Sequence, residues 1–112
     1  MDRVENYRRI LQQVVKRHAR FQPANGHIKT HAVCDVENDD YMVVDSGWNE
    51  KGRRINDVVF HFRLQDGIVH VERGDTDAEI VHELFNASVG TSDIILAYKA
   101  LPYQKLSDLV MA

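Results

Sequence analysis

The dipeptide Asp66-Gly67 is the feature that most constrains the fold of this 112-residue chain. It lies between two runs in which apolar and polar residues alternate, as they do in a half-buried strand. A two-residue type I′ turn needs positive φ at both central positions, and Gly adopts positive φ freely. The turn fixes a register that pairs Leu64 with Val69, Phe62 with Val71, Arg63 with His70, and His61 with Glu72. The sequence therefore predicts a β-hairpin with one apolar and one polar face.

Two more strands are predicted before this hairpin. Residues 27–36 have a period of two, and the single cysteine among them, Cys34, is expected to fill the core rather than to act as a nucleophile. The sequence Asn-Asp-Asp at 38–40 supplies a turn, and Tyr41 to Trp48 forms the second strand. The third strand runs from about Arg54 to Leu64, and its core side is expected to carry Val58, Phe60, Phe62 and Leu64. With the hairpin, these segments make an antiparallel four-stranded meander sheet.

Helical periodicity appears at both ends of this sheet. Residues 3–21 form an amphipathic helix whose apolar stripe is Val4, Tyr7, Leu11, Val14, Val15 and His18. Thr76 to Glu79 fits a capping box, which predicts the start of a second helix. Asp93 to Ala97 is a short, β-rich extended segment near the C-terminus. We therefore predict a single α+β domain over residues 1–112: an N-terminal amphipathic helix, the meander sheet, a helix and a short C-terminal extended segment.

Charge is distributed unevenly along the chain. Residues 1–20 carry six basic and two acidic side chains, a balance of +4, which leaves −7 for the rest of a chain whose net charge is −3. An acidic body repels phosphate at short range, so tight independent binding to DNA is not favoured. The basic residues Arg9, Lys16 and Arg20 nevertheless follow helical spacing and form a ridge. We interpret this ridge as a solvated helix face, with contact to nucleic acid as the alternative.

The composition limits the cellular compartment and the oligomeric state that we expect. No apolar run approaches the roughly 18 residues needed to span a bilayer, and the first residues contain no signal-peptide core. A single cysteine fits a reducing compartment. We therefore expect a cytoplasmic protein without membrane attachment. Its apolar fraction of 44% is ordinary for a globular protein that folds alone or as a homo-oligomer.

Catalytic and metal-binding patterns are weak. The chain has six histidines, but His27 and His31 are four residues apart in a predicted strand, about 13 Å along its axis, which is too far to share one ion. No serine lies in a nucleophile elbow, and no glycine-rich phosphate loop is present. The sequence thus predicts neither an enzyme nor a bound cofactor or metal. A metal-assisted hydrolase or nuclease built on His61 and neighbouring carboxylates is the lowest-ranked alternative.

Four residues have no sufficient structural explanation: Trp48, Arg53, Arg54 and His61. Trp48 has two interpretations. It can close one end of the sheet, or it can act with the two arginines as an interface anchor, since Trp and Arg are enriched among hot spots. These four residues are the candidate partner-binding site, and Arg9, Lys16 and Arg20 are the candidate nucleic-acid-binding residues.

An ordered series of short motifs covers almost the whole chain. It comprises Tyr7, Arg8, Ile10 and Gln12, then Gly47-Trp48, Arg54, His61, Asp66-Gly67, Thr76-Asp77, Glu83-Leu84 and Asp93-Ile94-Ile95-Leu96-Ala97. In order and spacing the series resembles the XisI family, the fdxN-element excision controlling factors of cyanobacteria. The resemblance implies a small cytoplasmic α+β protein that acts with a companion, XisH, in controlling site-specific DNA excision during heterocyst development. It implies a controlling factor rather than the recombinase, and it brings no catalytic residues.

Two functions follow as expectations. The first is a non-enzymatic regulator that binds a XisH-like partner, because XisH-like proteins resemble endonucleases that such a factor could control. The second is an accessory DNA-binding protein that uses Arg9, Lys16 and Arg20. Steeply salt-dependent DNA binding would distinguish the second from the first.

Overall fold

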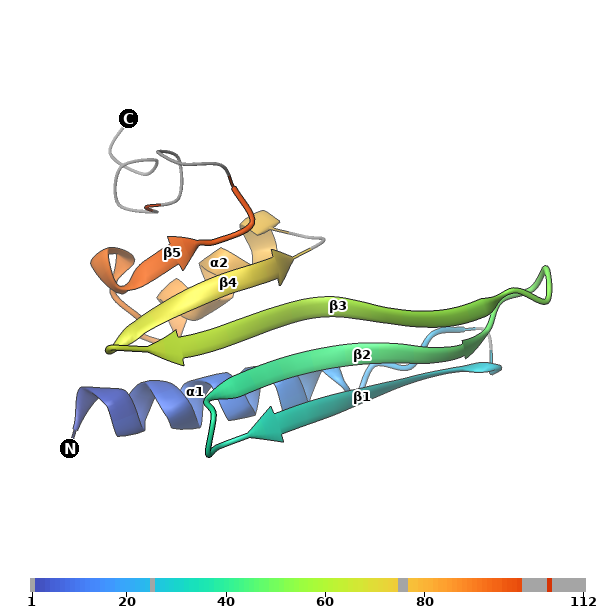
Figure 1. Ribbon diagram of the computed structural model, residues 1–112, viewed down its shortest axis with the longest axis horizontal. Helices are drawn as coiled ribbons and strands as arrows, with labels where there is room; N and C mark the ends of the chain where they lie inside the picture. The colour runs from blue at the N-terminus through green and yellow to red at the C-terminus, as the bar shows by residue number, and fades with distance from the viewer. Residues whose placement is uncertain (1, 25, 75–76, 100–104, 106–112) are drawn as a thin grey trace.

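A computed structural model describes residues 2–24, 26–74, 77–99 and 105 of the chain. Figure 1 shows the elements in chain order: α1 (Arg3–His18), β1 (Ile28–Asp35), β2 (Asp40–Trp48), β3 (Arg54–Gln65), β4 (Ile68–Gly74), α2 (Asp77–Asn86), a 3₁₀ turn (Thr91–Asp93) and β5 (Ile94–Leu96). The predicted α+β class, the N-terminal helix and the first four strands are confirmed. The predicted cap at Thr76 lies outside the described residues. Among the described helices, neither combines the length and the apolar character that a membrane span requires.

The sheet has five strands in the order β1-β2-β3-β4-β5. The first four are antiparallel, as predicted, but β5 pairs parallel to β4, with Val69 opposite Ile94 and Val71 opposite Leu96. The predicted four-stranded meander is therefore confirmed but incomplete, because the predicted C-terminal extended segment joins the sheet as a fifth, parallel strand. A parallel neighbour needs a crossover connection, and α2 provides it between β4 and β5.

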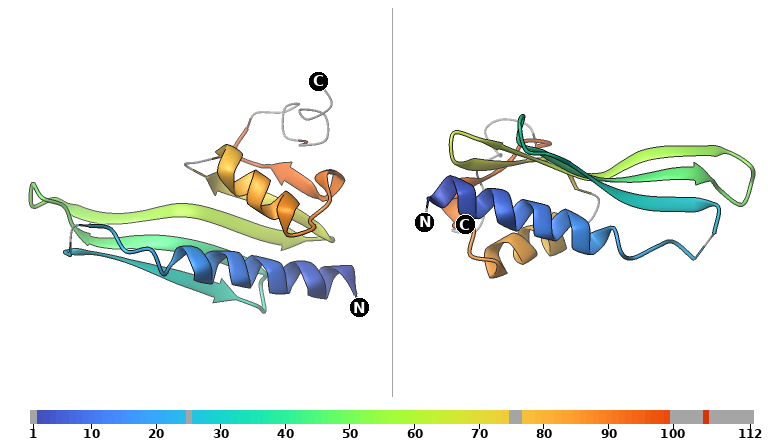
Figure 2. Two further views of the ribbon diagram at one scale, coloured as in Figure 1. Left: turned by 180° about the vertical axis from the view of Figure 1, so that it is seen from behind. Right: turned by 90° about the horizontal axis from the view of Figure 1, so that it is seen from below.

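Both helices lie against the same face of the sheet, which Figure 2 shows from behind and from below. Packing on this face makes the core. The α1 stripe contributes Tyr7, Ile10, Leu11, Val14 and Val15, all nearly inaccessible to solvent, and the sheet contributes Tyr41, Val43, Phe60, Phe62, Leu64, Val69 and Val71. Burying one such large apolar side chain stabilises the fold by about 1.5–3 kcal/mol. No described helix covers the other face, which we call the outer face.

Two β-bulges shift the register of β3. At the first, Val43 pairs with Phe60 and Val44 pairs with Val58, which leaves Val59 as the extra residue. Val59 then packs against the core, whereas Val58 shares the outer face with Val44. The predicted placement of Val58 on the core side is therefore wrong, because the extra residue reverses the alternation.

The second bulge lies between β3 and β4. His61 pairs with Arg73 instead of Glu72, which becomes the extra residue. The predicted pairing of His61 with Glu72 is thus wrong, while the other three pairs of the hairpin are confirmed. The turn itself has positive φ at both central residues, 55° at Asp66 and 74° at Gly67, as a type I′ turn requires.

Candidate functional site

The outer face of the sheet combines apolar and charged side chains. Its middle carries half-buried apolar residues from β1, β2 and β3: Val33, Met42, Val44 and Val58. These residues lie on this face because they alternate with the core residues of the same strands. The outer face is therefore an amphipathic surface rather than a fully solvated one.

One end of the outer face holds a polar cluster made of Asp40, His61, Arg63 and Glu72. Nε2 of His61 lies 2.9 Å from Oδ1 of Asp40, and Nε of Arg63 lies 3.4 Å from the same oxygen. Nη1 of Arg63 is also 4.0 Å from Oε1 of Glu72. Because the carboxylate only accepts, Nε2 of His61 carries the hydrogen in this arrangement. The cluster offers two carboxylates, a guanidinium and an imidazole to a binding partner.

The other end of the outer face is the tip of the β2–β3 hairpin. Trp48 is 51% exposed there, and the guanidinium carbon of Arg54 lies 5.5 Å from the centre of its ring, within cation–π range. Arg54 also donates to the carbonyl oxygen of Gly47 at 3.4 Å. Arg53 is exposed in the adjoining loop, where its backbone N–H donates to the side chain of Asn49. Three of the four predicted partner-binding residues thus come together.

His61 is not part of this group. It pairs with Met42 on β2, six residues from Trp48, which corresponds to about 20 Å along the strand. The predicted site is therefore two patches at opposite ends of one face. Sequence reasoning missed Asp40 and Arg63 at the His61 patch, because a turn explained Asp40 and the hairpin register alone explained Arg63.

The predicted basic ridge lies on the helix side of the molecule. Arg9 and Lys16 are exposed on α1, whereas Arg20 follows the end of the helix at His18. Arg9 donates to the side chain of Asn6 one turn earlier. The helix α1 that carries Arg9 and Lys16 and the outer face therefore lie on opposite sides of the sheet (Figure 2).

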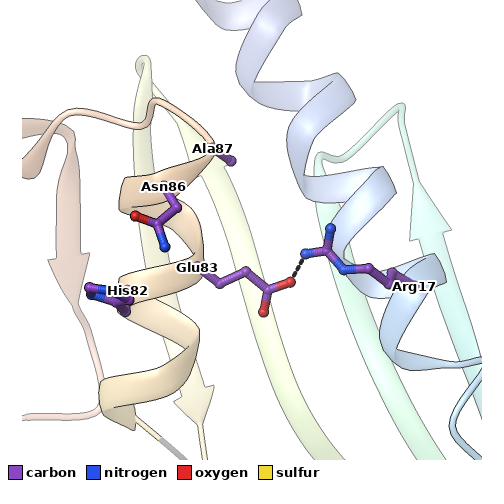
Figure 3. Close-up of a pocket in the computed structure, with 5 residues that line it drawn as sticks. All are labelled: Arg17, His82, Glu83, Asn86 and Ala87. Carbon is purple, nitrogen blue, oxygen red and sulfur yellow. Dashed lines mark ion pairs between the residues drawn. The ribbon is translucent and has the colours of Figure 1, made fainter.

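A shallow hollow between α1 and α2 is lined by Arg17, His82, Glu83, Asn86 and Ala87 (Figure 3). Glu83 spans it by pairing with Arg17, and its second oxygen lies 2.6 Å from Nε2 of His18. The ring of His18 in turn packs edge-on against Phe60 of the core. Glu83 therefore links the two helices, and this gives the Glu83-Leu84 motif a structural role.

Two residues of the N-terminal motif also make internal contacts. The hydroxyl of Tyr7 donates to Asp93 at 2.6 Å and accepts from the backbone N–H of Gly90 at 3.3 Å. Burial raises the pKa of Tyr7 above its usual value, and the hydrogen bond to Asp93 raises it further. Tyr7 thus joins the first motif of the chain to the last one.

Arg8 makes the second internal contact, which sequence reasoning missed. Its Nε and Nη2 donate to the two oxygens of Asp39 at 2.8 and 3.1 Å, and the hydroxyl of buried Tyr41 donates to Asp39 at 2.7 Å. The bonds from Arg8 hold the pKa of Asp39 below its usual value, while burial raises that of Tyr41. The local sequence around Asp39 predicts only a turn, and nothing in it reveals the distant arginine.

The alternative of a metal-assisted hydrolase or nuclease needs a group of metal ligands around His61. Within the part of the chain that the structure describes, no three His, Cys, Asp or Glu side chains are grouped to hold one ion. His61 approaches a single carboxylate, that of Asp40, and the guanidinium of Arg63 approaches the same oxygen. A cation already occupies the position beside this carboxylate, so these residues do not fit a metal site.

Solved structures and a family profile are similar to this chain. The crystal structure of fdxN element excision controlling factor XisI from Anabaena variabilis is similar with a TM-score of 0.78 and 24% identity, over 94% of this chain and 95% of that chain. A XisI-like protein from the same organism gives a TM-score of 0.84 and 23% identity, with the same coverage. These two likenesses show the fold. No curated protein sequence matches the chain. The family profile described as XisI protein matches residues 1–111, and the chain therefore belongs to the XisI family.

Proposed function

We propose that this protein is a non-enzymatic regulatory factor in the control of site-specific DNA excision, and that it acts by binding a XisH-like, endonuclease-related protein through its outer face. Family membership supports the excision-controlling role. The observation that supports the binding surface is the half-exposed Trp48 stacked with Arg54 on a sheet face that no described helix covers. Such Trp and Arg pairs are typical interface anchors.

The contacts that the motif residues make also support the outer face as the binding surface. On the helix side, Tyr7, Arg8 and Glu83 are occupied by contacts within the chain. On the outer face, Arg63 keeps 45% of its side chain exposed although it lies near two carboxylates. A partner that covers this face would desolvate the polar cluster, and charge pairs removed from water discriminate strongly between partners.

Co-expression with a XisH-like protein from the same genome, followed by co-purification and titration, tests this proposal. We expect a complex that Trp48→Ala and Arg63→Glu each weaken about tenfold or more, as loss of an interface anchor does. Phe21→Ala is the matched control, because Phe21 is 73% exposed but lies in a hollow on the helix side with Phe60. Absence of a complex at every salt concentration, or equal weakening by the control, would count against the proposal.

Direct DNA binding is the second candidate function, and the exposed ridge on α1 favours it. Replacing Arg9, Lys16 and Arg20 with glutamine removes three positive charges without touching the outer face. If the ridge binds DNA, the affinity for DNA falls steeply as the salt concentration rises. In the triple variant, the slope of log affinity against log salt concentration should become shallower by nearly three. DNA binding that survives the triple variant unchanged would exclude the ridge as the contact.

A further inference from the structure

The edge of the sheet formed by β1 is partly closed by a side chain of the same protein. The amide of Gln22 donates to the carbonyl oxygen of Thr30 at 2.9 Å and accepts from its backbone N–H at 3.0 Å. Gln22 thereby forms hydrogen bonds with both backbone groups of Thr30, as a neighbouring strand would. Side chains that block an edge in this way limit where another strand can add.

The Gln22 contact also reveals which backbone groups face outward. Since Thr30 points its N–H and C=O away from β2, the alternation of a strand makes Ala32 and Cys34 point the same way. Thr30 lies opposite Asp45 in the register and donates its hydroxyl to that carboxylate, as close non-hydrogen-bonded pairs allow. None of the residues that the structure describes bonds the outward groups of Ala32 and Cys34. Four backbone groups, those of Ala32 and Cys34, are therefore available on the part of this edge that follows Thr30.

One register lets a second copy of the chain use all four groups and leaves Gln22 in place. In it, two β1 strands run antiparallel about a twofold axis at Val33, and Ala32 of each copy exchanges two hydrogen bonds with Cys34 of the other. An axis at Ala32 would instead require Thr30, which Gln22 occupies. An axis at Cys34 would require Val36, which lies beyond the end of β1 at Asp35.

Charges along the edge agree with this register. His31 comes to lie opposite Asp35 of the second copy, and Lys29 comes to lie just past the end of that copy's β1, where the turn that contains Glu37 begins. Within the described part of the chain, Lys29 and Glu37 form no ion pair. We propose that two copies of this protein pair through their β1 edges, antiparallel about Val33, and join their sheets into one. This dimer does not rest on the proposed partner binding, although Val33 also lies at the β1 border of the outer face.

Cysteine cross-linking tests the register directly. In a Cys34→Ala background, Val33→Cys places two thiols in a directly opposed, non-hydrogen-bonded pair, so mild oxidation is expected to give a disulfide-linked dimer. His31→Cys in the same background is the control, because its two copies would be separated by four residues, about 13 Å along the strand. The unmodified chain, whose only cysteine is Cys34, should not cross-link. Cross-linking at position 31 or 34, or none at 33, would overturn the proposal.

Sedimentation velocity over a concentration series tests the association without any cross-link. Val33→Lys places two like charges at the axis and should weaken dimerisation at least tenfold, since an edge lysine opposes strand addition. Val58→Lys adds the same charge on the outer face of β3, two strands from the edge, and should leave dimerisation unchanged. A wild-type monomer at every concentration would overturn the proposal, as would equal effects of the two variants. A monomer whose complex with a XisH-like protein is lost in Val33→Lys but kept in Val58→Lys would assign the edge to that partner instead, since both residues lie on the outer face and only Val33 is on the edge strand.

Discussion

Replacing Gly47 with alanine is expected to destabilise the protein by about 3 kcal/mol, since it adds backbone strain to an overpacked contact. Gly47 has φ of +145°, which residues with a side chain rarely adopt. A β-carbon at this position would lie 2.9 Å from the carbonyl carbon of His27 and from Cα of Ile28, and closer still to the carbonyl oxygen of His27. These are backbone atoms at the start of β1, so they cannot move aside without shifting the strand. The same oxygen accepts the backbone N–H of Trp48, so the substitution also displaces Trp48.

Gly52 separates the cost of backbone strain from the cost of the overpacked contact. Gly52 has φ of +76° but no neighbour within 4 Å of a β-carbon, so Gly52→Ala should cost only the left-handed backbone energy of about 1 kcal/mol. Denaturant unfolding of both variants gives the comparison, with stability read from the midpoint and slope. If Gly47→Ala were no more harmful than Gly52→Ala, the close approach of His27 would not matter. The Gly47-Trp48 motif would then need another explanation.

Local patterns were sufficient for most of the fold. The Asp66-Gly67 turn and the α1 stripe were predictable because a few adjacent residues determine them. The bulges that moved Val58 and Glu72 were not, since an extra residue changes no local propensity and is selected by packing across the sheet. The pairing of Ile94–Leu96 with β4 was missed for the same kind of reason. A three-residue strand has no periodicity that reveals its neighbour.

The residues of the candidate site could be selected from the sequence, but their positions relative to one another could not. Trp48 and Arg54 could be selected because a glycine-flanked aromatic beside two arginines has no obvious core role, and the structure pairs them across two strands. His61 was named in the same candidate site and lies at the far end of the face. The register of β2 against β3 places Asp40 and Arg63 beside His61. This register depends on a bulge that cannot be predicted from the sequence.

The motifs that identify the family divide into contacts within the chain and exposed positions. Tyr7 reaches Asp93 across the sequence, and Glu83 reaches His18. These bonds fix α1, α2 and the segment before β5 relative to one another, so they preserve the fold whatever the protein binds. Trp48 and Arg54 instead lie on the outer face and add little to the core. A surface search for the partner should therefore begin on the outer face rather than with the full motif series.

Asp39→Asn is expected to lower the free energy of unfolding by about 2 kcal/mol at pH 7, because the charged hydrogen bonds from Arg8 are lost or weakened. Asp39 has φ of +55°, a conformation that asparagine tolerates as well as aspartate does, so the variant tests the charge and not the backbone. The side chains of Arg8 and Asp39 are only 20% and 18% exposed, which limits screening by solvent. Arg8→Gln should cost a similar amount, and the double variant should cost less than the sum of the two, since each removes the same interaction.

The pH dependence gives this prediction its sharpest test. Arg8 lowers the pKa of Asp39 in the folded state, so the carboxylate stabilises the fold above the ordinary aspartate pKa of about 3.9. That stabilisation is lost as the pH falls through the lower folded pKa, where wild-type Asp39 becomes neutral like the asparagine. The stability difference between wild type and Asp39→Asn should therefore be constant from pH 7 to about pH 5 and shrink below about pH 4. Urea unfolding at each pH measures it, and a difference that stayed constant down to about pH 2 would mean that the charge of Asp39 does not stabilise the fold.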